Sequence, residues 1–179
     1  MSILPLSTVL MLSRYRWSIA ILAALSGGGA RFVEILKRVG LSRDSLSRAL
    51  EQLIDAGWVI RNPGHGHPLR PEYLLTKSGE ALARTADSVI AAQNRLEIPV
   101  QDMSRWTLPL VHVLADGHHR FSAIERALPE ASPRAVSLGL KATVMQQLAK
   151  RKVLDGFPPT TEYLLARNGR YLAEALEIS

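Results

Sequence analysis

The sequence predicts a mainly α fold made of two tandem copies of one helical module, each copy carrying a small β-hairpin. Apolar residues recur at helical spacing between short Gly-containing turns, which predicts several short helices. The pattern of the first half then begins again: the Arg-Trp pair at 16–17 recurs at 105–106, and the Glu-Tyr-Leu-Leu run at 72–75 recurs at 162–165. Internal repetition of this kind is typical of a duplicated structural unit.

The shift between copies is 89 residues at the first pair and 90 at the second, which indicates one inserted residue near 129–131. We therefore place the domains at 1–96 and 97–179. The 179 residues carry a net charge of +6. The first domain contains 12 basic and 7 acidic residues, so it carries most of this charge. A basic chain favours an anionic partner such as nucleic acid.

Composition also excludes some classes of site. The chain has no Cys, so it has no disulfide, thiolate nucleophile or Cys-ligated zinc. The apolar start at 1–12 lacks a basic region and a cleavage site, and it is too short to span a bilayer. We expect a cytoplasmic protein with no membrane partner.

The first domain has its elements in a definite order. Helices are expected at 16–25, ended by three glycines, and at 32–39, followed by a tight turn. Ser42 is a good N-cap for the next helix, whose apolar stripe consists of Leu46, Ala49, Leu50 and Leu53. Gly57 ends that helix, a strand starts at Trp58 and returns at 72–75, and a long helix runs from Thr76 to about Arg95.

The outward face of the helix after Ser42 is unusual for a merely solvated surface. It carries Asp44, Ser45, Ser47, Arg48, Glu51 and Gln52. Short hydroxyls, an amide and an Arg suit base edges and phosphates in a major groove. A helix of this kind followed by a hairpin predicts a winged helix-turn-helix that binds double-stranded DNA.

The second domain is predicted to be a degenerate module with a short wing. Its helix, capped by Ser132, is expected to run to about Lys152, with Val153 and Leu154 as the strand. The positions of Ser45, Arg48 and Gln52 become Ala135, Leu138 and Ala142. The basic run at 150–152 has two interpretations: it grips phosphate, or it compensates the dipole at a helix C-terminus.

The first domain resembles the HxlR-type, MarR-like winged-helix regulators. The motifs that carry the resemblance are RWSIAILAALSGGGARFVEIL, GLSRDSLSRALEQLIDAGWVIR and HPLRPEYLLTKSGEAL. It implies that the helix after Ser42 enters the major groove, that the wing touches the backbone or minor groove, and that terminal helices form a homodimer. With Gln52 from the outward face, the expected DNA contacts are Ser42, Arg43, Ser45, Ser47, Arg48, Gln52, Arg61, His65, His67 and Arg70.

Several alternatives stay open. His65 and His67 could bind a metal, but two ligands without an acidic or Cys neighbour favour a wing tip, so no metal or cofactor is expected. No nucleophile, base and orienting residue fall together, which speaks against an enzyme. The resemblance implies a transcriptional repressor, with an unidentified small-molecule effector as a further partner. The alternatives are a winged-helix protein-interaction module or a tandem winged-helix protein like replication initiators.

The oligomeric state also has two interpretations. Leu10 and Leu12 in the apolar N-terminal segment, with the apolar face of the helix at 76–95, would be costly to expose in a monomer. They favour a homodimer. The two copies in one chain could instead form an intrachain pseudo-dimer.

Overall fold

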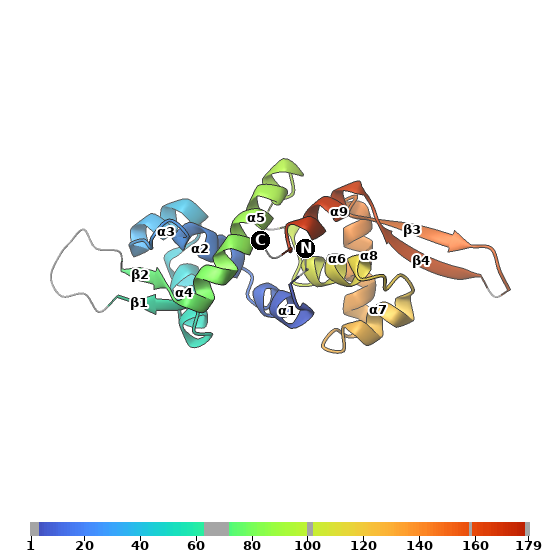
Figure 1. The fold of residues 1–179 in the computed structure, drawn as a ribbon, viewed down its shortest axis with the longest axis horizontal. Helices are drawn as coiled ribbons and strands as arrows, with labels where there is room; N and C mark the ends of the chain where they lie inside the picture. Colours follow the sequence, from blue (N-terminus) through green and yellow to red (C-terminus); the bar gives the residue numbers. More distant parts are fainter. Residues whose placement is uncertain (1–3, 63–71, 100–101, 158, 178–179) are drawn as a thin grey trace. The chain divides into compact units, whose positions relative to one another are not determined.

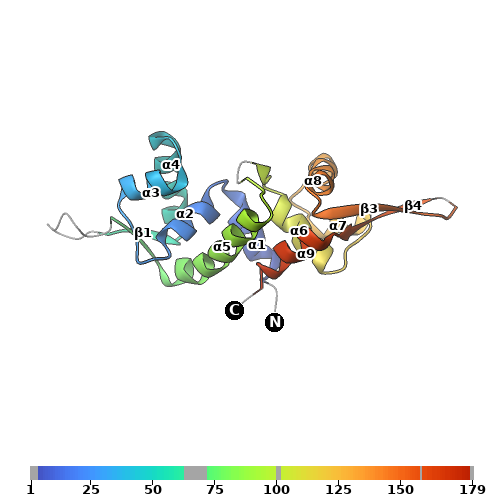
Figure 2. The same ribbon diagram turned by 90° about the horizontal axis from the view of Figure 1, so that it is seen from above.

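The structure is a computed structural model that describes residues 4–62, 72–99, 102–157 and 159–177 (Figure 1). The chain divides into two compact units, which we name by the repeat they contain. The first-copy unit comprises residues 15–90, and the second-copy unit comprises residues 1–14 with residues 91–179. Each unit consists mostly of helices and has one two-stranded antiparallel sheet, which confirms the predicted mainly α fold with small β wings (Figure 2).

The first-copy unit follows the predicted order closely. Its elements are α2 (Ser18–Leu25), α3 (Phe32–Val39), α4 (Arg43–Asp55), β1 (Val59–Arg61), β2 (Tyr73–Leu75) and most of α5 (Lys77–Arg95). Gly40, at φ 71°, takes the left-handed conformation that ends α3. Thr76 caps α5, since its Oγ1 accepts a hydrogen bond from the backbone N of Gly79 at 3.1 Å.

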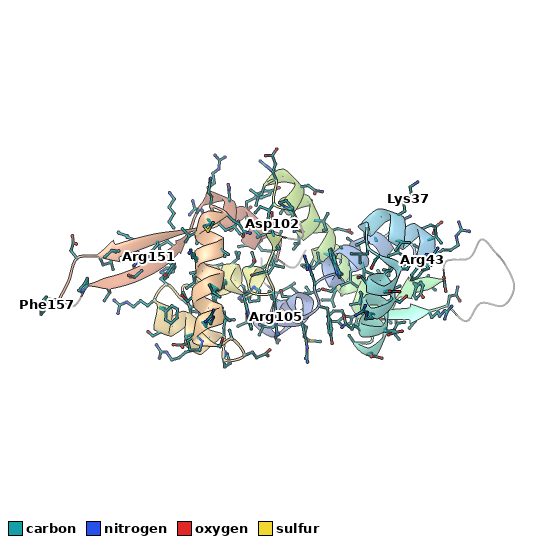
Figure 3. All side chains as sticks on the ribbon, turned by 180° about the vertical axis from the view of Figure 1, so that it is seen from behind. Lys37, Arg43, Asp102, Arg105, Arg151 and Phe157 are labelled. Carbon is teal, nitrogen blue, oxygen red and sulfur yellow. The ribbon has the colours of Figure 1, made fainter. Side chains whose placement is uncertain are left out.

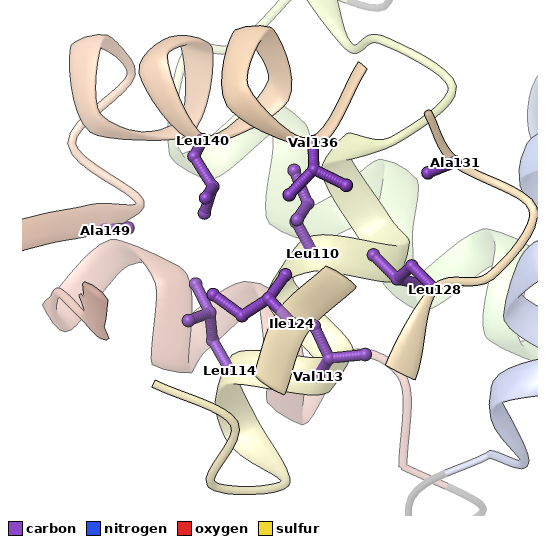
Figure 4. Close-up of a cluster of buried hydrophobic side chains, with 9 residues drawn as sticks. All are labelled: Leu110, Val113, Leu114, Ile124, Leu128, Ala131, Val136, Leu140 and Ala149. Carbon is purple, nitrogen blue, oxygen red and sulfur yellow. The ribbon is translucent and has the colours of Figure 1, made fainter. Parts of the chain in front are cut away.

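The second-copy unit has the same elements in the same order. They are α6 (Thr107–Ala115), α7 (Phe121–Ala127), α8 (Pro133–Met145), β3 (Ala149–Leu154), β4 (Thr160–Leu165) and α9 (Arg167–Glu174). Every residue of α6 from Thr107 to Leu114 is buried, so this helix is the centre of the unit. The buried cluster around it consists of Leu110, Val113, Leu114, Ile124, Leu128, Ala131, Val136, Leu140 and Ala149 (Figure 4).

Backbone hydrogen bonds show that the two copies are the same module. The amide of Tyr73 donates to the carbonyl of Ala30 at 3.0 Å, and the amide of Tyr163 donates to the carbonyl of His119 at 2.8 Å. These pairs correspond through the shifts of 90 and 89 residues seen in the sequence. The predicted repeat is therefore confirmed in three dimensions.

The predicted extent of α8 is wrong. The helix ends at Met145 and has the 13 residues of α4, instead of running to Lys152. The next turn contains Gln147 at φ 58°, where the first copy has Gly57 at φ 73°. A non-Gly residue rarely adopts this conformation, so the sequence at this point did not indicate a helix end.

The expected shortening of the second wing is also wrong. Ala149 and Lys150, not Val153 and Leu154, correspond to Val59 and Ile60, because Arg61 pairs with Tyr73 and Arg151 pairs with Tyr163. Both pairs enclose 11 residues, so the two wings have equal lengths. Six residues on each strand are paired in the second wing, from Ala149 with Leu165 to Leu154 with Thr160.

The expected boundary at 96–97 assigns the N-terminus to the wrong unit. Helix α1 (Leu6–Arg14) packs against α6, and its Leu6 and Leu10 contact the second-copy core. Leu4, two residues before this helix, donates through its amide to the carbonyl of Leu176 at 2.9 Å, and its own carbonyl lies 2.8 Å from Nε2 of His112. Helix α6 is buried on all sides, and α1 covers one of these sides.

Leu10 and Leu12, which were expected to need a dimer partner, are therefore covered within the chain itself. Leu10 contacts the second-copy core, and Leu12 is 1% exposed. Within the described residues, no single helix is long and apolar enough to cross a membrane. Helices α1 and α2 meet that test only when they are counted together as a broken pair.

Candidate nucleic-acid interface

Helix α4 presents one buried and one exposed face. Leu46, Leu50 and Leu53 are almost fully buried, which fixes the rotation of the helix in the first-copy unit. The opposite face is solvent-exposed and carries Arg43, Asp44, Ser47, Arg48, Glu51 and Gln52. The structure therefore brings together most of the residues that the sequence predicted as groove contacts.

Ser42 and Ser45 serve the start of this helix. The Ser42 hydroxyl accepts a hydrogen bond from the backbone N of Ser45 at 3.3 Å, and it donates to the Ser45 hydroxyl at 2.9 Å. Ser45 is half-buried, whereas Ser47 is exposed. Ser47 is consequently better placed than Ser45 to meet a base edge.

Two arginines extend from the exposed side of α4. The guanidinium of Arg43 lies over the Phe32 ring, 6.0 Å from its centroid, at the start of the helix (Figure 3). The Arg48 Nε donates to the carbonyl of Asp44 at 3.4 Å, which leaves its terminal guanidinium nitrogens outside that bond. Fixed guanidinium groups of this kind bind phosphates or guanine edges.

The strand part of the first wing is anchored by an ion pair. Arg61 Nη2 lies 2.7 Å from Oε1 of Glu72, the residue before β2, and the other carboxylate oxygen accepts from the backbone N of Phe32 at 3.4 Å. Arg61 is thus shared between a structural ion pair and any DNA contact. The predicted contacts His65, His67 and Arg70 lie outside the described residues.

A family model for HxlR-like helix-turn-helix proteins matches the chain twice, at residues 12–95 and 103–178. The chain belongs to the HxlR-like helix-turn-helix family. The two matches coincide with the two winged modules of the structure, so this member carries two HxlR-like modules in one chain.

Curated relatives share the helix-turn-helix description. The chain is 41% identical over 87 residues to the uncharacterized HTH-type transcriptional regulator YvaP of Bacillus subtilis strain 168, which covers 48% of the chain and 81% of YvaP. Identity to the HTH-type transcriptional regulator YodB of the same organism is 32%, covering 38% of the chain and 61% of YodB. Identity to Rv3095 of Mycobacterium tuberculosis strain H37Rv is 36%, covering 37% and 42%. No solved structure matches the chain.

Helix α3 of this HxlR-like module carries a further exposed cation, Lys37, that was not among the predicted DNA contacts. Lys37 is exposed in its last turn, immediately before the turn into α4 (Figure 3). The sequence signal was present, because two cations precede Gly40. The neighbouring Arg38 is engaged, since its Nη1 donates to the carbonyl of Ala24 at 2.6 Å.

The start of α3 is fixed by a capping glutamate. The Glu34 carboxylate accepts from the backbone N of Arg31 at 2.8 Å and lies 3.0 Å from the Arg31 guanidinium. The backbone hydrogen bond, followed by the guanidinium, holds the pKa of Glu34 below its usual value. The corresponding position in α7 is Ala123, so the second HxlR-like module lacks this cap.

The corresponding outward face in the second HxlR-like module has different chemistry. Leu138 and Met145 on α8 are 57% and 75% exposed, and Leu138 occupies the position of Arg48. Apolar side chains cannot donate to base edges, although they can contact a thymine methyl group. Among the described residues, no cluster of three His, Cys, Asp or Glu side chains could hold a metal ion.

Proposed function

We propose that this HxlR-like protein is a sequence-specific DNA-binding transcriptional regulator that represses its target genes. The observation that carries the proposal is the exposed polar face of α4, on a helix capped by Ser42 and rotationally fixed by a buried leucine stripe. This arrangement supports insertion of α4 in the major groove. The printed names of its relatives as HTH-type transcriptional regulators support the same function. Because duplex DNA is its partner, we propose a cytoplasmic location.

The proposed binding mode divides the first-copy contacts into two kinds. Ser47 and Gln52 read base edges, while Arg43 and Arg48 bind phosphate or guanine. Ser42 and Ser45 orient the helix, and Arg61, His65, His67 and Arg70 place the wing on the backbone or minor groove. The small-molecule effector remains a prediction.

The experiment compares binding to duplexes that flank the chain's own gene with binding to a scrambled duplex. Ser45→Ala with Ser47→Ala should reduce discrimination between the two duplexes and leave general binding nearly unchanged, because hydroxyls carry no charge. If the double variant discriminates as well as the parent, the assignment of the Ser47 hydroxyl to the groove is wrong. If the parent binds neither duplex, the proposed function is wrong.

Repression has its own test in a reporter assay. A promoter from the flanking DNA drives a reporter gene in cells with and without the chain. We expect lower reporter output with the chain, and restored output with the Arg48→Ala variant. Higher output with the chain would show activation instead.

For the oligomeric state, we propose that one chain supplies the two winged modules that a dimer of single-module subunits would supply. The burial of Leu12 and the packing of α1 on α6 support this intrachain alternative over the homodimer. Sedimentation at tens of micromolar should give the mass of one chain, 19.7 kDa. A mass of two chains would restore the homodimer prediction.

A second candidate function is supported by the exposed apolar side chains of α8. Leu138 and Met145 would suit a protein partner, as expected for a winged-helix interaction module. In that case Leu138→Ser would abolish capture of the protein partner, and the parent chain would not discriminate between the two duplexes. The DNA titrations above separate this candidate from the regulator.

A further inference from the structure

The second wing, residues 149–165, carries three consecutive cations on a strand. Lys150, Arg151 and Lys152 are all exposed on β3. They follow the end of α8 by several residues, so they do not compensate a helix dipole as one interpretation of the sequence required. Phosphate binding is the interpretation that the structure leaves.

The equivalent glutamates of the two wings form ion pairs with different arginines. In the first wing Glu72 pairs with Arg61 at 2.7 Å. In the second wing the equivalent Glu162 lies 3.7 Å from Nε of Arg120, which belongs to the start of α7 and not to the wing. Arg151, the equivalent of Arg61, has a hydrogen bond of 3.5 Å to the Thr161 hydroxyl.

The cause of this difference lies in α7. In the first copy, Arg31 is held by Glu34, but Ala123 stands at the corresponding position of the second copy. Arg120 therefore turns to Glu162. In the described part of the chain, no carboxylate forms an ion pair with any of the three β3 cations.

Strand geometry distributes these cations over the hairpin. Because side chains alternate along a strand, Lys150 and Lys152 share one face and Arg151 lies on the other. At the tip, Phe157 is fully exposed (Figure 3). Asp155 is the remaining carboxylate of the wing in the sequence. A hairpin with cations on both faces and an aromatic tip suits a groove with phosphates on either side.

We propose that the second wing is a DNA-binding site of its own, with Lys150, Arg151 and Lys152 on backbone phosphates and Phe157 in the minor groove. The inference rests on the proposed function, since it takes duplex DNA as the partner. From the sequence alone, the replacement of Arg48 and Gln52 by Leu138 and Ala142 predicts that DNA contact is concentrated in the first copy, and the inference adds a contact in the second. On α8, Leu138 and Ala142 stand where α4 has Arg48 and Gln52, so we expect this second site to depend less on base sequence than the first.

The test titrates the full chain against a fluorescein-labelled 40-base-pair duplex of mixed sequence at several KCl concentrations. The variant K150Q/R151Q/K152Q should bind about tenfold or more weakly at low salt. The slope of log affinity against log salt should flatten by about one unit for each phosphate that the variant no longer neutralises. K150R/K152R keeps the charge and should bind like the parent.

Phe157 gives an independent readout. Phe157→Ser should lower affinity severalfold and leave the salt slope unchanged, because an aromatic tip releases no counterions. Circular dichroism and hydrogen exchange of the β3 and β4 amides check that each variant keeps the hairpin.

The outcomes separate the two proposals. Failure of the parent chain to bind any duplex would overturn the proposed function and this inference together. If Arg48→Ala weakens binding while the triple variant matches the parent in affinity and slope, only the second-wing inference fails. Loss of binding to phosphatidylserine vesicles by the triple variant, with DNA binding unchanged, would assign the wing to a membrane surface instead.

Discussion

The two winged modules share a backbone and differ in what they expose. The corresponding helices α4 and α8 have equal lengths, and the two wings have the same register. Yet the position of Arg48 is occupied by Leu138, and the wing glutamates pair with different arginines. The buried positions preserve the fold, while exposed positions have diverged.

We infer from this difference that the two copies have different tasks in DNA binding. In our account the first copy reads bases through α4, and the second copy grips the DNA backbone through β3. We therefore expect equivalent substitutions in the two copies to change the free energy of unfolding by similar amounts. Their effects on DNA binding should differ.

The largest effect on stability should come from one glycine in each copy. A Cβ built on Gly79 would collide with the carbonyl oxygen of Trp58, and one on Gly169 would collide with that of Leu148. We expect Gly79→Ala and Gly169→Ala each to destabilise its own unit by about 3 kcal/mol. Hydrogen exchange measured separately in each unit would show this loss of stability. A strong effect in only one copy would show that the two glycines do not have the same structural role.

A smaller effect with opposite signs should follow from exchanging the residues after α4 and α8. Gly57→Gln should destabilise the first-copy unit by about 1 kcal/mol, because φ is 73° there. Gln147→Gly should stabilise the second-copy unit by roughly 0.5–1 kcal/mol, since it removes strain at φ 58° but adds freedom to the unfolded chain. Urea unfolding monitored in each unit measures both changes. Destabilisation by Gln147→Gly would show that its side chain has a stabilising role.

The smallest effect should depend on pH and occur only in the first copy. The folded pKa of Glu34 lies below its usual value of 4.5, so its stabilisation is complete above that value and is lost as pH falls through the lowered pKa. Glu34→Gln should lower the melting temperature slightly at pH 7 and have no effect in strong acid. Melting curves of both proteins at several pH values check this, and a constant difference at all pH values would contradict it.

Most of the fold could be predicted from local signals. Ser42, Gly40 and Gly57 fixed the bounds of α3 and α4 because caps and left-handed glycines act within a few residues. The end of α8 could not be predicted, since Gln147 replaces the glycine signal. The placement of α1 on α6 was equally inaccessible, because it depends on packing between segments about 100 residues apart.

The candidate site was predictable in composition but not in detail. Periodicity identified the outward face of α4 correctly, since buried leucines determine its orientation. The capping role of Ser42 and the ion pair of Arg61 depend on distances that spacing alone does not give. The role of the basic run at 150–152 stayed open between phosphate binding and dipole compensation, because the sequence predicted a helix where the structure has the strand β3.

The central claim is that base reading belongs to the first copy, and matched double variants test it most directly. Ser47→Ala with Arg48→Ala alters α4, and Ser137→Ala with Leu138→Ala alters the corresponding positions of α8. The measured quantity is the ratio of affinities for the duplex flanking the chain's own gene and for a scrambled duplex. We predict that the α4 variant reduces this ratio about tenfold or more, as expected for roughly 1–3 kcal/mol per good base contact, whereas the α8 variant leaves it unchanged. Equal reductions from both variants would show that both copies read bases and would contradict the account.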